Sequence, residues 1–141
     1  MRILGIDPGE ARTGLAVCDK SELLASPLLT IKEYSRDKLA RRIAEIAQQE
    51  KAEQIVVGCP VNMNGTRGPA AEKSEELARQ LRELSGLPVV LWDERRTTVE
   101  AHGYLSASDV SGKRRKESVD QLAAVLILEG YLNFRKQKKE E

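Results

Sequence analysis

The first third of the chain alternates short apolar runs with turns and then becomes helical. Residues 2–7 and 14–18 are apolar runs of strand length, separated by a Pro8-Gly9 turn. The interval between them is too short for a crossover helix, so we expect an antiparallel hairpin. A third strand is expected near residues 27–31. Leucine, isoleucine and alanine at helical spacing then predict an amphipathic helix over residues 37–49.

Two further strands and a second helix follow in the pattern. Residues 54–58 form a β-branched run that ends in glycine, which is typical of a buried central strand. A loop of turn residues over 60–69 precedes an amphipathic helix that ends near Gly86, and residues 88–93 predict a fifth strand. Three leading strands followed by alternating helices and strands predict an α/β domain with a mixed five-stranded sheet flanked by helices.

The last third contains the densest positive charge and the most apolar helix. A threonine after the fifth strand can cap a short helix that runs to about residue 106. Residues 107–117 have no apolar period, so we expect a mobile basic loop there. Ser118 and Gln121 fit a capping box for a buried helix over residues 119–132. We therefore expect a single domain over residues 1–134 and a charged, fraying tail over residues 135–141.

Charge and cysteine content exclude some classes of protein. The chain has 141 residues, of which 23 are Lys or Arg and 22 are Asp or Glu. Because these charges nearly cancel, only their placement can indicate a nucleic-acid partner. Cys18 and Cys59 lack metal-ligand spacing, which favours reduced thiols over a disulfide framework or a structural zinc site. No segment has the pattern of a signal peptide or a membrane span, so we expect a cytoplasmic protein without a membrane partner.

Three acidic residues stand at the ends of predicted elements. Asp7 ends the first strand, Glu94 follows the fifth, and Asp120 begins the last helix. Strand ends of an open α/β sheet gather at one edge, so these carboxylates can converge there. A divalent cation would relieve their mutual repulsion, and oxygen ligands suit Mg²⁺ or Mn²⁺. Two ions about 4 Å apart could activate a water and stabilise the leaving oxygen during phosphodiester hydrolysis.

Each acid also has an ordinary explanation when it is considered alone. Asp7 precedes a turn, Glu94 could form a surface ion pair, and Asp120 suits the helix dipole. The coincidence of three element ends favours the metal site over these explanations. Asp93 is the rival of Glu94, because strand alternation points the two side chains in opposite directions, and we choose Glu94.

Four ordered motifs resemble those of a known family. They are Ile6-Asp7-Pro8-Gly9 with Arg12 and Gly14-Leu15-Ala16-Val17, Val57-Gly58-Cys59-Pro60 with Asn62-Met63-Asn64-Gly65, Trp92-Asp93-Glu94-Arg95 with Thr97-Thr98, and Asp120-Gln121-Leu122-Ala123-Ala124. Through them the chain resembles, over essentially its whole length, the YqgF family of RNase H-like proteins, also called RuvX. The resemblance implies an RNase H-like fold similar to that of the RuvC resolvases. It also implies processing of the 5′ end of pre-16S ribosomal RNA, with Asp7, Glu94 and Asp120 as catalytic metal ligands.

Basic and polar residues near the predicted site are candidates for substrate binding. The basic run immediately precedes Asp120, so it would lie over the proposed metals, and a guanidinium at Arg12 can hold a phosphate with two hydrogen bonds. Family members often have two basic residues where this chain has Glu10-Ala11, which weakens the expected phosphate contact there. Solvated loops are the ordinary explanation for such residues. The candidates are Arg12, Asn64, Arg95, Arg96, Lys113, Arg114, Arg115 and Lys116.

The residues favour a metal-dependent endonuclease that acts on nucleic acid, and the resemblance implies structured RNA, with pre-16S rRNA in a pre-ribosomal particle as the expected substrate. A Holliday junction resolvase acting on branched DNA is an alternative, because the same site can hydrolyse either backbone. A non-catalytic RNA-binding module is an alternative of another class. An actin-like ATPase has a similar leading hairpin, but it needs a second domain that this length does not supply. Either a monomer or a homodimer is compatible with the sequence.

Overall fold

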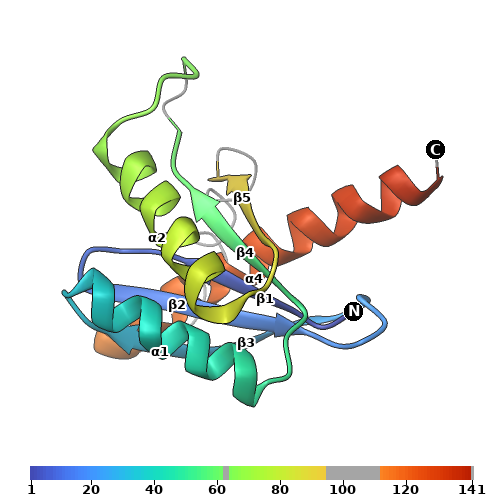
Figure 1. The fold of residues 1–141 in the computed structure, drawn as a ribbon, viewed down its shortest axis with the longest axis horizontal. Coiled ribbons are helices and arrows are strands. Elements are labelled where there is room, and N and C mark those ends of the chain that lie inside the picture. Colours follow the sequence, from blue (N-terminus) through green and yellow to red (C-terminus); the bar gives the residue numbers. More distant parts are fainter. Residues whose placement is uncertain (62–63, 95–111, 141) are drawn as a thin grey trace.

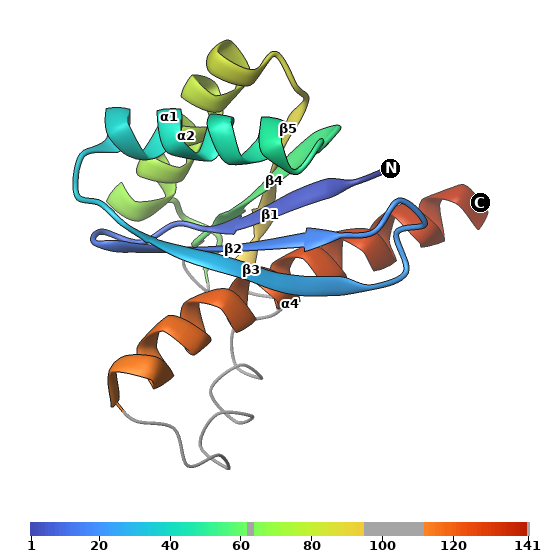
Figure 2. The same ribbon diagram turned by 90° about the horizontal axis from the view of Figure 1, so that it is seen from below.

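The structure is a computed structural model that describes residues 1–61, 64–94 and 112–140, with side chains in the last range described over 119–138. The elements in chain order are β1 (Ile3–Asp7), β2 (Arg12–Cys18), β3 (Ala25–Lys32), α1 (Arg36–Gln49), β4 (Gln54–Cys59), α2 (Pro69–Ser85), β5 (Val89–Asp93) and α4 (Gly112–Glu140). The strands form a five-stranded sheet in the order β3-β2-β1-β4-β5. Helices α1 and α2 cover one face of this sheet, and α4 crosses the other (Figure 1, Figure 2).

The pairing of the strands confirms the predicted mixed sheet. β1 and β2 form the expected antiparallel hairpin, and β3 continues it on the far side of β2. β4 pairs with β1 in parallel, and β5 pairs with β4 in parallel. Because β1, β4 and β5 run in the same direction, their carboxyl ends lie at one edge of the sheet.

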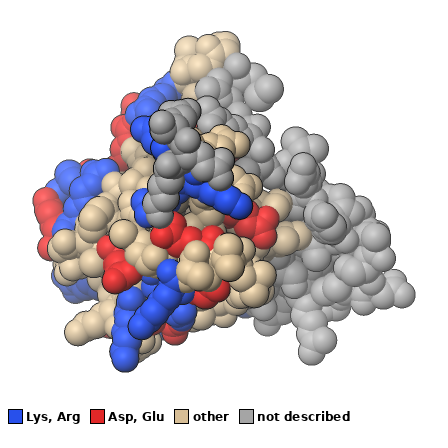
Figure 3. Space-filling model, turned by 90° about the vertical axis from the view of Figure 1, so that its right-hand side faces the viewer, with Lys and Arg blue, Asp and Glu red and all other residues tan. Residues whose placement is uncertain are grey.

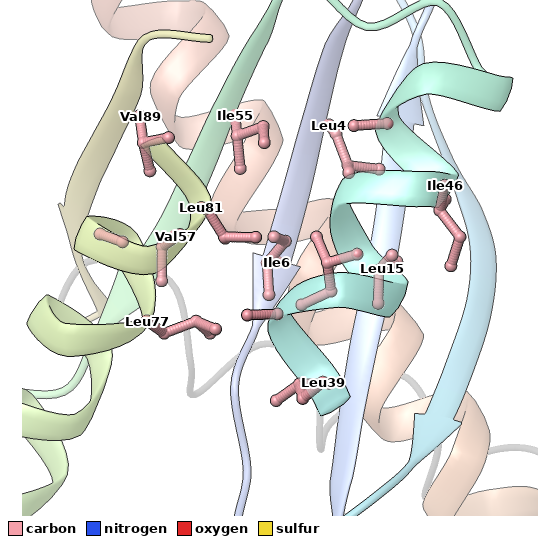
Figure 4. Packing of buried hydrophobic residues seen from close by; sticks show 14 of the residues in the cluster. Leu4, Ile6, Leu15, Leu39, Ile46, Ile55, Val57, Leu77, Leu81 and Val89 are labelled. Atoms are coloured by element: carbon pink, nitrogen blue, oxygen red, sulfur yellow. The ribbon is translucent and has the colours of Figure 1, made fainter. Parts of the chain in front are cut away.

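Strand alternation divides the buried side chains between two hydrophobic clusters. Leu4, Ile6 and Leu15 point to the face covered by α1 and α2, where they pack against side chains such as Leu39 and Leu77 (Figure 4). The intervening strand residues, including Ile3, Ala16, Val56 and Trp92, pack against Ala124, Ile127 and Leu128 of α4. Each fully buried leucine or isoleucine contributes about 1.5–3 kcal/mol of transfer free energy, so both faces stabilise the sheet.

Glycines in the strands allow α4 to approach the sheet closely. A Cβ atom at Gly14 would overlap with the backbone carbonyl of Asp120. A Cβ atom at Gly5 would lie 2.9 Å from the Cβ of Leu128 and 3.2 Å from the carbonyl oxygen of Ala124. Backbone packs directly on backbone at Gly14, so this contact fixes how far α4 stands from the sheet.

The last helix begins earlier and ends later than the sequence pattern predicts. α4 starts at Gly112, so residues 113–116 are helical, and the predictions of a loop there and of a capping box at Ser118 are wrong. Lysine, arginine and glutamate are good helix formers, and a docked helix extends into such flanks without an apolar period. The expected loop at 107–111 and the short helix before it lie outside the described residues. Within the described part of the chain, no helix is long and apolar enough to cross a membrane.

Residues 135–140 continue α4 instead of forming the frayed tail that the sequence predicted. Arg135, in this part of the helix, forms an ion pair with Glu22. Glu22 accepts a hydrogen bond from Arg135 Nε at 2.8 Å and another from the N-terminal ammonium at 2.9 Å. The hydrogen bond from Arg135 is the main cause that lowers the pKa of Glu22 to about 2. Figure 3 looks onto the end of the molecule that carries both termini, where basic and acidic side chains lie next to one another. Glu22 therefore joins the N-terminus and α4 to the turn between β2 and β3.

Replacing Glu22 with glutamine should destabilise the protein in a pH-dependent way. The pKa of Glu22 in the folded chain lies below the ordinary value of 4.5. Its stabilisation is therefore present above about pH 4.5 and is lost as the pH falls toward 2. We expect Glu22→Gln to lower the free energy of unfolding by about 1–2 kcal/mol at pH 7 and by much less at pH 3. Urea denaturation at both pH values measures this. Glu76→Gln, which removes an exposed pair with Arg79, should change little, and an equal loss at both pH values for Glu22→Gln would contradict the ionic origin.

Replacing Gly14 with alanine should also destabilise the protein, because the new methyl group would push α4 away from β2. We expect a loss of about 1–3 kcal/mol in the free energy of unfolding, the usual cost of overpacking. Gly65→Ala is the control, since a Cβ atom there meets nothing within 4 Å and the substitution tests only the cost of a positive φ of 87°. Thermal and urea denaturation of the two variants measure the difference. A Gly14→Ala variant as stable as the wild type would show that α4 can shift without cost.

Candidate functional site

Asp7 and Glu94 meet at the carboxyl edge of the sheet, on the face covered by α4. Asp7 is the last residue of β1 and follows Ile3 and Gly5 on this face. Trp92 of β5 packs in the α4 cluster, and Glu94, two residues later, points the same way. The hydrogen bond between the Asp7 and Glu94 side chains shows that the two carboxyl groups are in contact.

The neighbouring acid Asp93 belongs to the other face of the sheet. Asp93 is in register with Cys59 of β4, and the thiol of Cys59 is directed toward the carbonyl of Ala71 in α2. Of the two acids that the sequence left as rivals, Glu94 is therefore the one that reaches Asp7.

Gly58 of β4 provides the space in which these two carboxyl groups meet. β4 lies between β1 and β5, and the pairing of Ile6 with Val57 puts Gly58 beside Asp7. A Cβ atom on Gly58 would lie 2.8 Å from Glu94 Oε1 and 2.6 Å from Ile127 Cδ1. A side chain at this position would therefore displace Glu94. Gly58 and Gly14 were not among the predicted site residues, although a glycine inside a strand often marks such a close approach.

The environment of Asp7 strongly favours its protonated form. Burial, the hydrogen bond with Glu94 and the negative charge of Glu94, in that order of size, together raise the pKa of Asp7 to about 9. At neutral pH the two carboxyl groups therefore retain a proton between them. Such a pair is the arrangement in which a bound cation can replace the proton and neutralise both groups.

Asp120 of α4 lies at the same edge, on the other side of β1. Gly14 is paired with Asp7 in the β1–β2 hairpin, and the backbone of Asp120 packs directly on Gly14. The Asp120 carboxylate lies 3.3 Å from Arg12 Nε, and its side chain is 20% exposed. The Asp120 carboxylate therefore lies near the Asp7–Glu94 pair but forms an ion pair with Arg12.

The donor set fits a hard divalent cation. All three side chains offer carboxylate oxygens, the ligands that Mg²⁺ and Mn²⁺ prefer. As the side chains stand, no group of three or more His, Cys, Asp or Glu residues within the described ranges has the arrangement of a formed metal site. Asp7 and Glu94 are already in contact, whereas Asp120 is turned to Arg12. Metal binding would have to exchange the Asp7–Glu94 proton and the Asp120–Arg12 ion pair for metal ligation.

The structure places only some of the predicted substrate-binding residues. Arg12 lies at the site through its ion pair with Asp120. Asn64 lies in the exposed turn after β4, where its Oδ1 accepts hydrogen bonds from the backbone N–H of Thr66 at 3.1 Å and from its hydroxyl at 2.7 Å. Arg95 and Arg96 lie outside the described residues. Lys113, Arg114, Arg115 and Lys116 belong to the first turns of α4, of which the backbone alone is described.

Comparison with known proteins identifies the family. The model of the RuvX family, described as Holliday junction resolvase, matches residues 1–134. The chain belongs to the RuvX family. This match spans every described strand and most of α4, and it includes Asp7, Glu94 and Asp120.

Relatives of similar length support this assignment. A protein of Thermoanaerobacter pseudethanolicus is 45% identical over 139 residues, which are 98% of this chain and 100% of the relative. A protein of Bacillus cytotoxicus is 46% identical over 135 residues, which are 94% of this chain and 98% of the relative. Both bear the name "Putative pre-16S rRNA nuclease". RuvX-family proteins of this kind thus share nearly the full length of this chain.

A solved structure with the same fold is that of Thermus thermophilus RuvC in complex with a Holliday junction. Its TM-score is 0.62 at 16% sequence identity, and the match covers 96% of each chain. At this identity the likeness shows the fold alone. The predicted RNase H-like architecture, with its mixed five-stranded sheet, is confirmed.

Proposed function

We propose that this RuvX-family chain is a metal-dependent endonuclease that hydrolyses phosphodiester bonds and processes the 5′ end of pre-16S rRNA in the cytoplasm. The observation that carries the proposal is the contact between Asp7 and Glu94, two carboxyl groups that hold a proton at a strand-end edge. When both of these groups are ionised they repel each other, and a divalent cation bound between them relieves that repulsion. The names of the relatives that share 45% and 46% of their residues with this chain support the choice of substrate.

Each residue of the site has a defined task in this proposal. Asp7, Glu94 and Asp120 would hold Mg²⁺ or Mn²⁺, with two ions per site. The bound metal supplies an activated water and neutralises charge on the leaving oxygen. If Asp120 held the metal, its ion pair with Arg12 would be broken, and the Arg12 guanidinium could then contact a phosphate oxygen of the substrate.

The basic residues around the site would hold the nucleic-acid backbone on either side of the cleaved bond. Residues 113–116 precede Asp120 on the same helix, so their backbone runs directly into the site. Asn64, Arg95 and Arg96 complete the proposed set of substrate-binding residues. Backbone contacts of this kind position a substrate without reading its sequence.

Cleavage of branched DNA is the second candidate function. The description of the matching family model and the fold shared with RuvC favour it. Resolution of a four-way junction needs two active sites on one substrate, so this function would require a homodimer with both sites on one side, whereas RNA processing can proceed with a monomer.

Replacement of Asp7 or Glu94 should abolish cleavage. We expect Asp7→Asn and Glu94→Gln each to lower the rate of Mg²⁺-dependent cleavage at least about 100-fold, because each removes a charge that holds the metal. Cleavage of a pre-16S rRNA fragment and of a four-way DNA junction, side by side with Mg²⁺ and with EDTA, measures the rate and the choice of substrate. Asp93→Asn is the matched control and should retain activity, because Asp93 belongs to the other face. Unchanged cleavage by Asp7→Asn would refute the metal site, and binding without cleavage by the wild type would indicate an RNA-binding module.

Metal binding should also be visible without any substrate. Mg²⁺ at about ten times its Kd should stabilise the folded wild type by about 1.4 kcal/mol, because it binds the folded chain alone. The melting temperature, followed by circular dichroism during a Mg²⁺ titration, reports this gain. Asp7→Asn and Glu94→Gln should show almost no Mg²⁺-dependent shift, and Asp93→Asn should shift as the wild type does. A shift of wild-type size in all three variants would mean that the ion binds elsewhere.

A further inference from the structure

A second concave surface begins where the carboxylate site ends. A cavity of about 660 Å³ lies between the first turns of α1 and α2, and Pro8 and Gly9, the two residues after Asp7, form part of its wall. Asp7 faces α4, whereas the cavity is lined by residues of α1 and α2, which cover the other face of the sheet. The β1–β2 turn therefore separates the cavity from the carboxylates at the same edge of the sheet.

The side chains around this cavity suit a nucleotide. Arg36 and Lys73 line it and provide two positive charges from two different helices. Tyr34 also lines it, and this tyrosine is 83% exposed. A large aromatic ring that leaves most of its surface in water contributes little to the core but offers a flat surface on which a base can stack.

Glu10 limits the positive charge of the cavity in the free protein. Its Oε1 atom lies 3.7 Å from Lys73 Nζ, and the two side chains are 88% and 50% exposed. An ion pair this exposed is weak, so a phosphate group can displace Glu10 from Lys73. Glu10 therefore competes with a phosphate group for the Lys73 ammonium.

The start of α2 lies against the same surface. Gly68 caps this helix without a side-chain hydrogen bond, and Pro69 and Ala70 of the first turn line the cavity. The positive end of the helix dipole thus reinforces the charge of Lys73, which lies one turn further along α2.

We propose that this cavity binds an unpaired nucleotide of the substrate strand, next to the phosphodiester bond that is cleaved. The base stacks on Tyr34, and the phosphate contacts Arg36 and Lys73 after displacing Glu10. A paired base keeps both faces stacked on its neighbours, so only an unpaired nucleotide can place its base on Tyr34. This inference rests on the proposed nuclease function, because it assigns the cavity to the same strand that crosses the carboxylate site.

Binding without cleavage tests the proposal. The probe is a fluorescein-labelled ten-residue oligouridylate, and its Kd for the full-length chain is measured by fluorescence anisotropy in EDTA. We expect Tyr34→Ala and Lys73→Gln each to raise the Kd about five- to tenfold, through lost stacking and a lost phosphate contact. Glu10→Gln should lower the Kd about two- to threefold, because Lys73 then has no competitor.

Two matched variants separate the cavity from general effects of charge and folding. Tyr34→Phe keeps the ring and should bind within twofold of the wild type. Arg42→Gln removes one positive charge from an exposed position of α1 that does not line the cavity, and it should also bind within twofold. A Kd that changes less than twofold in both Tyr34→Ala and Lys73→Gln would overturn the proposal. A loss in Arg42→Gln as large as in Lys73→Gln would do the same, because it would show general charge attraction only.

Two further oligonucleotides show which kind of nucleic acid the cavity binds. The binding test in EDTA is also independent of the cleavage test of the proposed nuclease. An oligothymidylate of equal length should respond to Tyr34→Ala as the RNA does, whereas a blunt duplex should not, and an equal response of the duplex would overturn the requirement for an unpaired base. Anisotropy in EDTA does not depend on metal chemistry. If Asp7→Asn still cleaves while Tyr34→Ala binds weakly, the metal site fails and the cavity stands. If Asp7→Asn does not cleave while Tyr34→Ala binds as the wild type does, the cavity proposal fails and the metal site stands.

Discussion

The contact of the α4 backbone with Gly14 is the constraint on which the site depends. β2 pairs with β1 so that Gly14 lies opposite Asp7, and Asp120 packs on that glycine from above. One hairpin therefore determines the positions of two of the three carboxylates. Gly58 has the same role for the third, because it leaves the space that Glu94 fills. The acids are brought together by backbone positions that tolerate no side chain, rather than by attraction between the acids themselves.

Carboxyl groups at the two ends of the sheet have opposite pKa shifts. At the end with both termini, Glu22 has two cationic partners, and its pKa is lowered to about 2. At the other end, Asp7 has a second carboxyl group as its partner, and its pKa is raised to about 9. The first arrangement is complete within the protein and stabilises the fold. In the second, the group that contacts Asp7 is itself an acid, an arrangement that an external cation could stabilise.

Periodicity predicted the sheet and the helices α1 and α2 because each of these elements buries one face and exposes the other. It failed at both ends of α4, where charged residues extend a helix that is anchored only in its middle. The choice between Asp93 and Glu94 depended on which face buries Trp92, a fact of packing rather than of local pattern. The importance of Gly14 and Gly58 depends on strand register, which joins residues far apart in the sequence. Tyr34, Arg36 and Lys73 come from three segments without a shared motif, so only the fold brings them to one cavity.

The position of α4 at the end of the chain has a consequence for the order in which the protein matures during translation. β1, β2, β4 and β5 have all been synthesised before the first residue of α4, so the sheet edge with Asp7 and Glu94 can assemble on the emerging chain. Asp120 reaches this edge only when the last helix has left the ribosome and docked on Gly14. The three acids can therefore come together only after α4 has docked, which makes the completion of this edge the last step of folding.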